Sequence, residues 1–197
     1  MRELLLLSGG VDSAALAAWR RPALALTIDY GQRAASAEIH ASQQICAALT
    51  VPHEALTASV KHLGSGVMAG QRSSPHSENE EFWPFRNQYL ITLAAMVAIQ
   101  RGLDAVVIGT VATDGRHRDG SAEFLHAMRS ILQLQEGAIA LLAPAKELTS
   151  AQLVRASGID QAVLAWSHSC HAATLACGNC PGCTKHSEVM SELGIAR

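Results

Sequence analysis

The sequence has few charged residues and no excess of either sign. Only 16% of its 197 residues are Asp, Glu, Lys or Arg, and the formal net charge is −2 at pH 7. A protein that holds nucleic acid in its main site usually presents a basic face, and this composition offers no basic excess to build one. The composition therefore disfavours nucleic acid as a partner.

Long apolar runs are also missing. A membrane-spanning helix needs about 20 consecutive apolar residues, and no run in this sequence approaches that length. The opening run at residues 4–7 ends in Ser8-Gly9-Gly10, which makes it too short for a signal-peptide core, and no cleavage-like end follows. We expect a cytoplasmic protein with no membrane partner. The 49% hydrophobic content suffices for a full core and excludes a disordered chain.

Short apolar runs alternate with helical patterns. We expect strands at residues 3–7, 23–29, near 51–52, 105–108 and 138–142. We expect helices at residues 13–20, 34–49, 87–101, 122–135, from Thr149 (with Gln152 completing a capping box) and at 184–193. Residues 64–81 lack periodicity and predict a mobile loop, a candidate lid. The alternation predicts an α/β fold in one domain, residues 1–197, with a parallel sheet and helices on both faces.

Six residues, Ser8-Gly9-Gly10-Val11-Asp12-Ser13, stand where the first strand turns into the first helix. Glycines let backbone N–H groups approach an anion, and the helix N-terminus adds a positive dipole end. Ser8 and Ser13 can add hydroxyl donors, and Asp12 can hold Mg²⁺ or orient a hydroxyl. No lysine follows the glycines, as the P-loop of a kinase would require. The segment predicts a phosphate-binding loop.

Four of the five cysteines, Cys170, Cys177, Cys180 and Cys183, form the pattern C-x6-C-x2-C-x2-C. Two overlapping C-x-x-C knuckles can present thiolates to one tetrahedral ion, and a closed set of four cysteines is usually a structural zinc site. An iron–sulfur cluster and a catalytic thiol pair are the alternatives. We expect Zn²⁺ in an element of residues 166–193. Cys46 lies in an apolar helix and is expected to be a buried thiol.

The glycine loop, as it stands, resembles the signature of the PP-loop ATP pyrophosphatase superfamily. Members of that superfamily cleave ATP between its α- and β-phosphates and pass AMP to a carboxylate or carbonyl oxygen, from which a nucleophile displaces it. The resemblance implies adenylation rather than kinase chemistry, with ATP and Mg²⁺ as cofactors.

The loop and the cysteines together resemble the 7-cyano-7-deazaguanine synthase family of queuosine biosynthesis, and the agreement extends along nearly the whole chain. Tyr30-Gly31-Gln32-Arg33 is similar to the family's Y-G-Q-[RK], and Pro84-Phe85-Arg86-Asn87 is similar to its P-x-R-N. Ser169-Cys170 and the segment from Cys177 to Cys183 are similar to its zinc ribbon. The resemblance implies an adenine-nucleotide alpha hydrolase-like fold with a small C-terminal zinc ribbon of four cysteines.

The resemblance also implies an ATP-dependent, AMP-forming ligase. It would convert 7-carboxy-7-deazaguanine and ammonia to 7-cyano-7-deazaguanine, and it would be a homodimer. The residues expected to hold the ATP phosphates are Ser8, Gly9, Gly10, Val11, Asp12 and Ser13. Arg86 and Asn87 would lie near the nucleotide or the substrate carboxylate, and Asp114 and Asp119 would pair with the N–H edge of the deazaguanine. Asp12, Ser13 and Arg86 are the expected catalytic residues.

The sequence departs from the family pattern in four places, one of which is Ser169-Cys170-His171, where the family has S-C-Y. The loop Asp114-Gly115-Arg116-His117-Arg118-Asp119-Gly120 lacks the aromatic residues of the family's D-Y-S-G-Y-P-D-C, which leaves His117 as a candidate acid or base. Ser150 stands where a lysine is usual, with Lys146 nearby. The basic residues after the last cysteine are reduced to Lys185 and His186.

Three alternatives follow for the function. The altered loop favours a related ligase that passes the adenylated deazaguanine to another amine acceptor, such as a protein. The second alternative is a tRNA thiolase in which Cys180 and Cys183 pass sulfur, although the lack of an excess of basic residues disfavours it. A catalytically degenerate nucleotide-binding or interaction subunit is the third.

Overall fold

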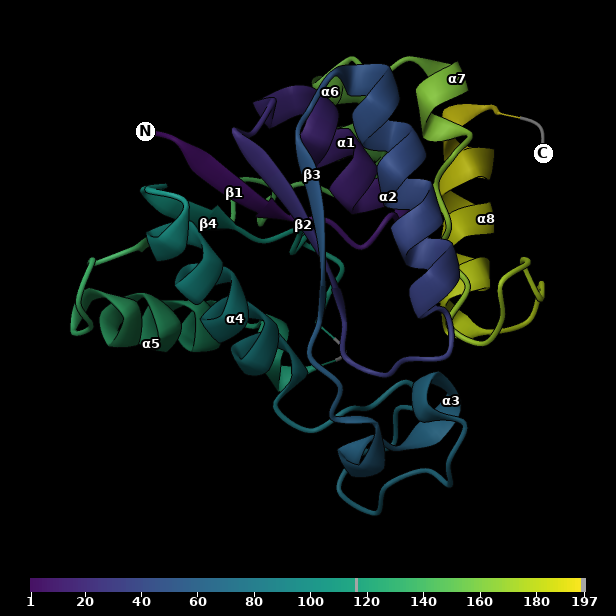
Figure 1. The fold of residues 1–197 in the computed structure, drawn as a ribbon. Helices are drawn as coiled ribbons and strands as arrows, with labels where there is room; N and C mark the ends of the chain where they lie inside the picture. The colour runs from purple at the N-terminus through teal and green to yellow at the C-terminus, as the bar shows by residue number, and fades with distance from the viewer. Residues whose placement is uncertain (116, 196–197) are drawn as a thin grey trace.

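The computed structural model describes residues 1–115 and 117–195 (Figure 1). The strands are β1 (Glu3–Leu6), β2 (Leu24–Asp29), β3 (His53–Thr57), β4 (Ala105–Val107) and β5 (Ala140–Leu142). The helices are α1 (Val11–Arg20), α2 (Ala35–Leu49), α3 (Gly66–Ala69), α4 (Arg86–Gln100), α5 (Ala122–Gln133), α6 (Ser150–Ser157), α7 (Gln161–Leu164) and α8 (Pro181–Leu193). Two 3₁₀ helices, η1 (Lys61–Leu63) and η2 (Arg118–Gly120), lie in loops.

The predicted order of strands and helices is confirmed, with α3 and α7 as additions that the sequence patterns did not indicate. The last helix begins at Pro181 rather than at Thr184, because proline suits the first turn of a helix and Cys180 caps it. Arg116, a member of the predicted substrate loop, lies outside the described residues.

The five strands form one parallel sheet in the order β3-β2-β1-β4-β5. The chain first builds outward from β1 to β3 and then crosses back to place β4 on the other side of β1. The sheet therefore has a topological switch point between β1 and β4. In open parallel sheets, ligands bind beyond the carboxyl ends of the strands at such a point. The glycine loop follows β1 and the predicted substrate loop follows β4, so the fold brings both to this crevice.

The side chains of each strand alternate between two hydrophobic layers, as the pleat requires. Leu4 and Val106 belong to the layer covered by α4 and α5. Leu5 and Val107 belong to the opposite layer, which α1, α2, α6 and α8 cover. Figure 1 shows these two groups of helices on either side of the sheet. The predicted α/β fold with helices on both faces is confirmed.

The segment between β3 and α4 lies beyond the carboxyl end of β3 (Figure 1). Its residues 64–81, expected to form a mobile loop, include the short helix α3. Trp83 is 4% exposed and packs edge-on against Tyr30, with the ring centroids 4.9 Å apart. The indole therefore belongs to the core and anchors the segment to the sheet; the mobility of the loop stays a prediction.

Two further sequence features are reproduced. The hydroxyl of Thr149 accepts a hydrogen bond from the backbone N–H of Gln152, and the Gln152 side chain accepts one from the backbone N–H of Thr149, which completes the predicted capping box. Cys46 is buried, as expected. In the described part of the chain, every helix is too short or too polar to cross a bilayer.

Candidate active site

The glycine loop connects β1 to α1 and is held by its own hydroxyl groups. The Ser13 hydroxyl donates to the carbonyl oxygen of Gly10 at 3.0 Å, and the hydroxyl oxygens of Ser8 and Ser13 lie 3.2 Å apart. Gly10 is the N-cap residue of α1, and no side chain caps this helix end. The first N–H groups of α1 are therefore left to a ligand, which is the arrangement that binds phosphate.

Gly9 is required by packing as well as by backbone conformation. Its φ is +75°, and a Cβ at this position would lie 2.8 Å from the Glu38 carbonyl oxygen and 3.0 Å from the Ala41 Cβ. On the other side, the His168 N–H donates to the Gly9 carbonyl at 2.8 Å. The loop is thus fixed between α2 and the segment that precedes the cysteines.

A cavity of about 340 Å³ opens over this loop, and every loop residue except Gly9 lines it. A neighbouring cavity of about 740 Å³ shares part of its wall. Arg86, Asn87 and Asp114 line both cavities, whereas Asp119 lines the second alone. The fold thus brings the predicted phosphate loop and the predicted substrate residues to one place; their catalytic and binding roles stay predictions.

Asp119 and Asn87 contact each other directly. The backbone N–H of Asn87 donates to the Asp119 carboxylate at 3.1 Å, and the Asn87 side-chain amide donates to the Asp119 carbonyl at 2.9 Å. Asp119 therefore fixes the start of α4. Its other carboxylate oxygen, Oδ1, is buried and has no hydrogen-bond partner among the described residues, so it can still accept a bond from a ligand.

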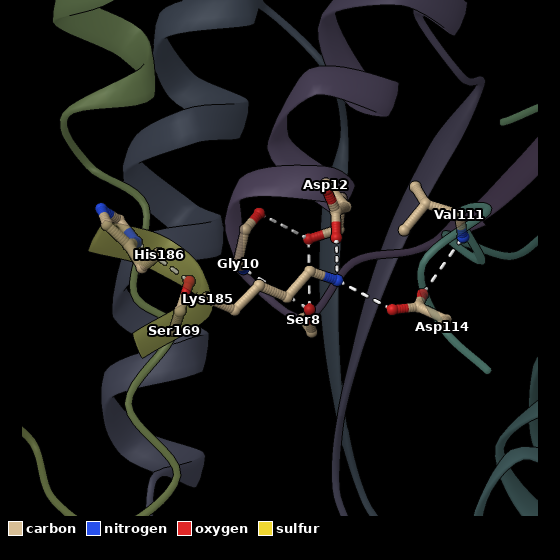
Figure 2. A network of polar contacts seen from close by, with 9 residues as sticks. Ser8, Gly10, Asp12, Val111, Asp114, Ser169, Lys185 and His186 are labelled. Atoms are coloured by element: carbon tan, nitrogen blue, oxygen red, sulfur yellow. Dashed lines mark hydrogen bonds and ion pairs between the residues drawn. The ribbon is translucent and has the colours of Figure 1, made fainter. Parts of the chain in front are cut away.

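Lys185, from α8, lies between two of the predicted carboxylates (Figure 2). Its Nζ is 2.9 Å from Oδ2 of Asp12 and 2.8 Å from Oδ1 of Asp114. The second oxygen of Asp114 accepts from the Val111 N–H at 3.1 Å, while Oδ1 of Asp12 is buried without a partner among the described residues. No sequence pattern placed Lys185 in the site. The available signal was its position two residues after Cys183, near the start of α8.

Glu38 is a second residue of the cavity that the sequence did not reveal. Its carboxylate accepts a hydrogen bond from the Gln32 side chain at 2.7 Å. Burial raises the pKa of Glu38 to about 7, although the Gln32 hydrogen bond and the Arg86 charge lower it. Arg86 also contacts the sulfur of Met68 at 3.2 Å. The cavity thus holds a carboxyl group that titrates near neutral pH beside a guanidinium.

The four cysteines lie together, on a loop and on the start of α8, with no strand in residues 166–195. Their sulfur atoms all lie within 4.8 Å of one another, with Cys177 and Cys183 at 3.9 Å and Cys170 and Cys180 at 4.0 Å. A tetrahedral zinc site with Zn–S bonds of about 2.3 Å needs sulfur atoms about 3.8 Å apart. The His171 N–H also donates to the Cys180 sulfur at 3.3 Å, which favours the thiolate. The cluster fits a zinc ion.

This cysteine cluster is structurally joined to the glycine loop. A Cβ at Gly182 would lie 1.9 Å from the Ser169 carbonyl oxygen, so only glycine allows α8 to begin against this segment. The adjacent His168 is the residue that bonds to Gly9. None of the four cysteines lines either cavity, which fits a structural site and disfavours sulfur transfer by Cys180 and Cys183.

The zinc assignment predicts the result of removing one ligand. Purified protein should contain about one zinc ion per chain, as a closed site of four cysteines does. Cys180→Ser should lose most of this zinc and melt at a lower temperature, because the metal cross-links the loop to α8. Elemental analysis and thermal denaturation measure both effects. Cys46→Ala is the matched control, and equal zinc content in the Cys180 variant would contradict the assignment.

The pKa of Glu38 predicts a pH dependence of stability. In the folded protein it is about 7, against an ordinary value of 4.5. As the pH rises from 4.5 towards 7, the unfolded chain loses this proton before the folded chain does, so stability falls and the loss is complete above 7. The loss of stability is about 3 to 4 kcal/mol, since the two pKa values differ by about 2.5 and a difference of one corresponds to about 1.4 kcal/mol.

Glu38→Gln should therefore flatten the stability profile between pH 5 and 7.5, as measured by urea denaturation. Glu136→Gln, at an exposed carboxylate, should leave the profile of the parent protein intact. An unchanged slope in Glu38→Gln would show that this carboxyl ionises normally.

Known proteins are similar to this chain along almost its whole length. The family model described as "Queuosine biosynthesis protein QueC" matches residues 2–194. The 7-cyano-7-deazaguanine synthase of Methanospirillum hungatei is 30% identical, in a match that covers 99% of this chain and 97% of the relative. The synthases of Methanosarcina mazei and Acinetobacter baylyi are each 26% identical, over 99% and 98% of this chain and 96% and 92% of theirs. These matches confirm the resemblance and the prediction of an enzyme similar to these synthases. The chain belongs to the QueC family of queuosine biosynthesis proteins.

Proposed function

We propose that the protein converts 7-carboxy-7-deazaguanine and ammonia to 7-cyano-7-deazaguanine, with ATP split to AMP and pyrophosphate at each of two steps. The observation that carries the proposal is the meeting of the glycine loop, Arg86, Asn87 and Asp114 at one cavity. The names of the relatives, which match almost the whole chain, support the same substrate and product. By analogy with the family, we expect the functional unit to be a homodimer.

The glycine loop would bind the phosphates of ATP. The uncapped start of α1 and the hydroxyl groups of Ser8 and Ser13 supply hydrogen-bond donors. Asp12 fits a magnesium ligand, because its Oδ1 is buried and has no hydrogen-bond partner among the described residues. Magnesium would neutralise phosphate charge there. The contribution of the protein is then chiefly positioning and electrostatic stabilisation.

The chemistry is a repeated adenylation. A carboxylate oxygen of the substrate attacks the α-phosphorus of ATP, and pyrophosphate leaves into the glycine loop. Ammonia attacks the acyl carbon and loses a proton, and AMP leaves with the transferred oxygen to give the amide. The amide oxygen attacks a second ATP, and loss of AMP and of the nitrogen protons gives the nitrile.

The side chains of Arg86 and Glu38, which line the cavity, suit this sequence of steps. The planar guanidinium of Arg86 can orient a carboxylate through paired hydrogen bonds. Glu38, whose pKa is about 7, can accept the protons that the nitrogen releases, since a base works best with a pKa near the working pH. Asp114 and Asp119 would pair with the N–H edge of the deazaguanine, and His117, whose Nε2 lies 3.5 Å from a Glu81 oxygen, borders the neighbouring cavity of about 740 Å³.

Mass spectrometry of the products tests the proposal. The protein is incubated with Mg²⁺, ATP and 7-carboxy-7-deazaguanine, with and without ammonium, and AMP, pyrophosphate and the purine product are measured. We expect AMP formation that requires the substrate, and nitrile that requires ammonium. Adenylation that ends without nitrile under these conditions would favour the ligase with another amine acceptor. No AMP under any condition would leave a nucleotide-binding subunit and overturn the proposal.

The role of Asp12 gives a separate prediction. Asp12→Asn should lower the rate of AMP formation by about 100-fold or more, in the range found when a stabilising group of a catalytic site is removed. Asp104→Asn is the control, because Asp104 precedes β4 at the opposite end of the sheet and accepts from the Arg2 N–H. Both variants should retain their zinc. Turnover by Asp12→Asn at the parent rate would remove Asp12 from the mechanism.

A further inference from the structure

The cations available to a phosphate in this cavity are few. The chain contains only three lysines, Lys61, Lys146 and Lys185. Lys146 donates to the carbonyl oxygen of Gly120 at 2.8 Å, and neither Lys61 nor Lys146 lines either cavity. Among the described residues that line the two cavities, Lys185 and Arg86 are the lysine and arginine side chains. A lysine ammonium group in contact with a nucleotide bound in these cavities therefore belongs to Lys185.

A neutral residue of the cavity wall offers a comparison with Lys185. Ser150 lines both cavities together with Lys185. It is 4% exposed, and its hydroxyl has no hydrogen-bond partner among the described residues. Position 150 thus faces the site without supplying a charge.

Lys185 reaches the same site from α8. Figure 2 shows its side chain extending from α8 across the glycine loop to Asp12 on one side and Asp114 on the other. Its side chain is 41% exposed, so it can move without opening the core. Phosphate oxygens entering over the loop would compete with both carboxylates for this ammonium, because a phosphate carries more negative charge and accepts the same hydrogen bonds.

We propose that Lys185 is the phosphate-binding lysine of this protein. It pairs with Asp12 and Asp114 when no nucleotide is bound, and it transfers to the phosphate chain of ATP when nucleotide enters. The inference rests on the proposed use of ATP and names the residue that recognises its phosphates. It also gives the cysteine element a second role, since Lys185 follows Cys183 by two residues on the same helix.

Nucleotide binding without the purine substrate tests this assignment. The affinities of a non-hydrolysable ATP analogue and of pyrophosphate are measured by isothermal titration calorimetry in the presence of Mg²⁺. Lys185→Met should weaken both by about 10- to 100-fold, the size of a lost hydrogen bond to a charged group. Lys185→Arg should retain most of the affinity. Lys146→Met, the matched control near position 150, should bind as the parent protein does.

A second substitution distinguishes a phosphate contact from a structural effect. Adding Ser150→Lys to Lys185→Met should recover at least a tenfold part of the lost affinity, because it supplies an ammonium at another position that lines the same cavities. Zinc content and melting temperature of each variant report its folding. Parent-like affinity in Lys185→Met, or no recovery with Ser150→Lys in folded protein, would overturn the assignment.

The assignment of Lys185 and the proposed reaction can fail independently of each other. If the parent protein binds the ATP analogue through Lys185 but forms no nitrile, the proposed reaction fails and the assignment of Lys185 stands. If the parent protein forms nitrile and Lys185→Met binds nucleotide normally, the reaction stands and the assignment fails.

Discussion

The close approach of the glycine loop to α2 constrains the whole site. It requires a residue with no side chain at position 9, since a Cβ would lie 2.8 Å from a backbone carbonyl oxygen. This packing directs the start of α1 into the crevice between β1 and β4. The bond from His168 to Gly9 then joins the loop to the cysteine element, whose helix α8 carries Lys185 back over the loop. The glycine loop, α2 and the cysteine element with α8 thus meet around the start of α1.

Before any ligand enters, the acidic side chains of the cavity already share its cations. Asp12 and Asp114 share Lys185, and Glu38 lies near Arg86 with a pKa raised by burial. A nucleotide and a carboxylate substrate both bring negative charge, so binding must exchange these internal pairs for pairs with the ligands. Each exchange takes a cation from a carboxylate of the protein, so Asp12 and Asp114 need new partners once Lys185 moves to a phosphate. Magnesium at Asp12 and the N–H edge of the substrate at Asp114 would supply them and limit the desolvation cost.

Local patterns were enough to predict the fold and the two main motifs. The apolar runs at β1 and β4 are short and continuous, as in strands buried on both faces, and the glycine loop and the cysteines are recognisable from spacing alone. The short helices α3 and α7, with four residues each, contain too few turns to show periodicity. Asp119 was expected at the substrate, and the structure adds that it also fixes the start of α4.

Lys185 and Glu38 could not be found in this way, because their roles depend on tertiary contacts. Lys185 pairs with residues 173 and 71 positions away, and nothing near it in the sequence resembles a phosphate site. Glu38 is a single acid in an alanine-rich helix, and only the fold of the chain shows that it borders the cavity beside Arg86. That Ser150 and Lys185 line the same cavities is likewise visible only in the folded structure.

The central claim is that this cavity adenylates a carboxylate, and oxygen labelling tests it most directly. Substrate carrying ¹⁸O in both carboxylate oxygens is converted with unlabelled ATP in ordinary water, and the phosphate products are analysed by mass spectrometry. Attack on the α-phosphorus predicts that each AMP carries one ¹⁸O atom and that pyrophosphate carries none. Label in inorganic phosphate, with ADP as the nucleotide product, would mean attack on the γ-phosphorus and would contradict the account.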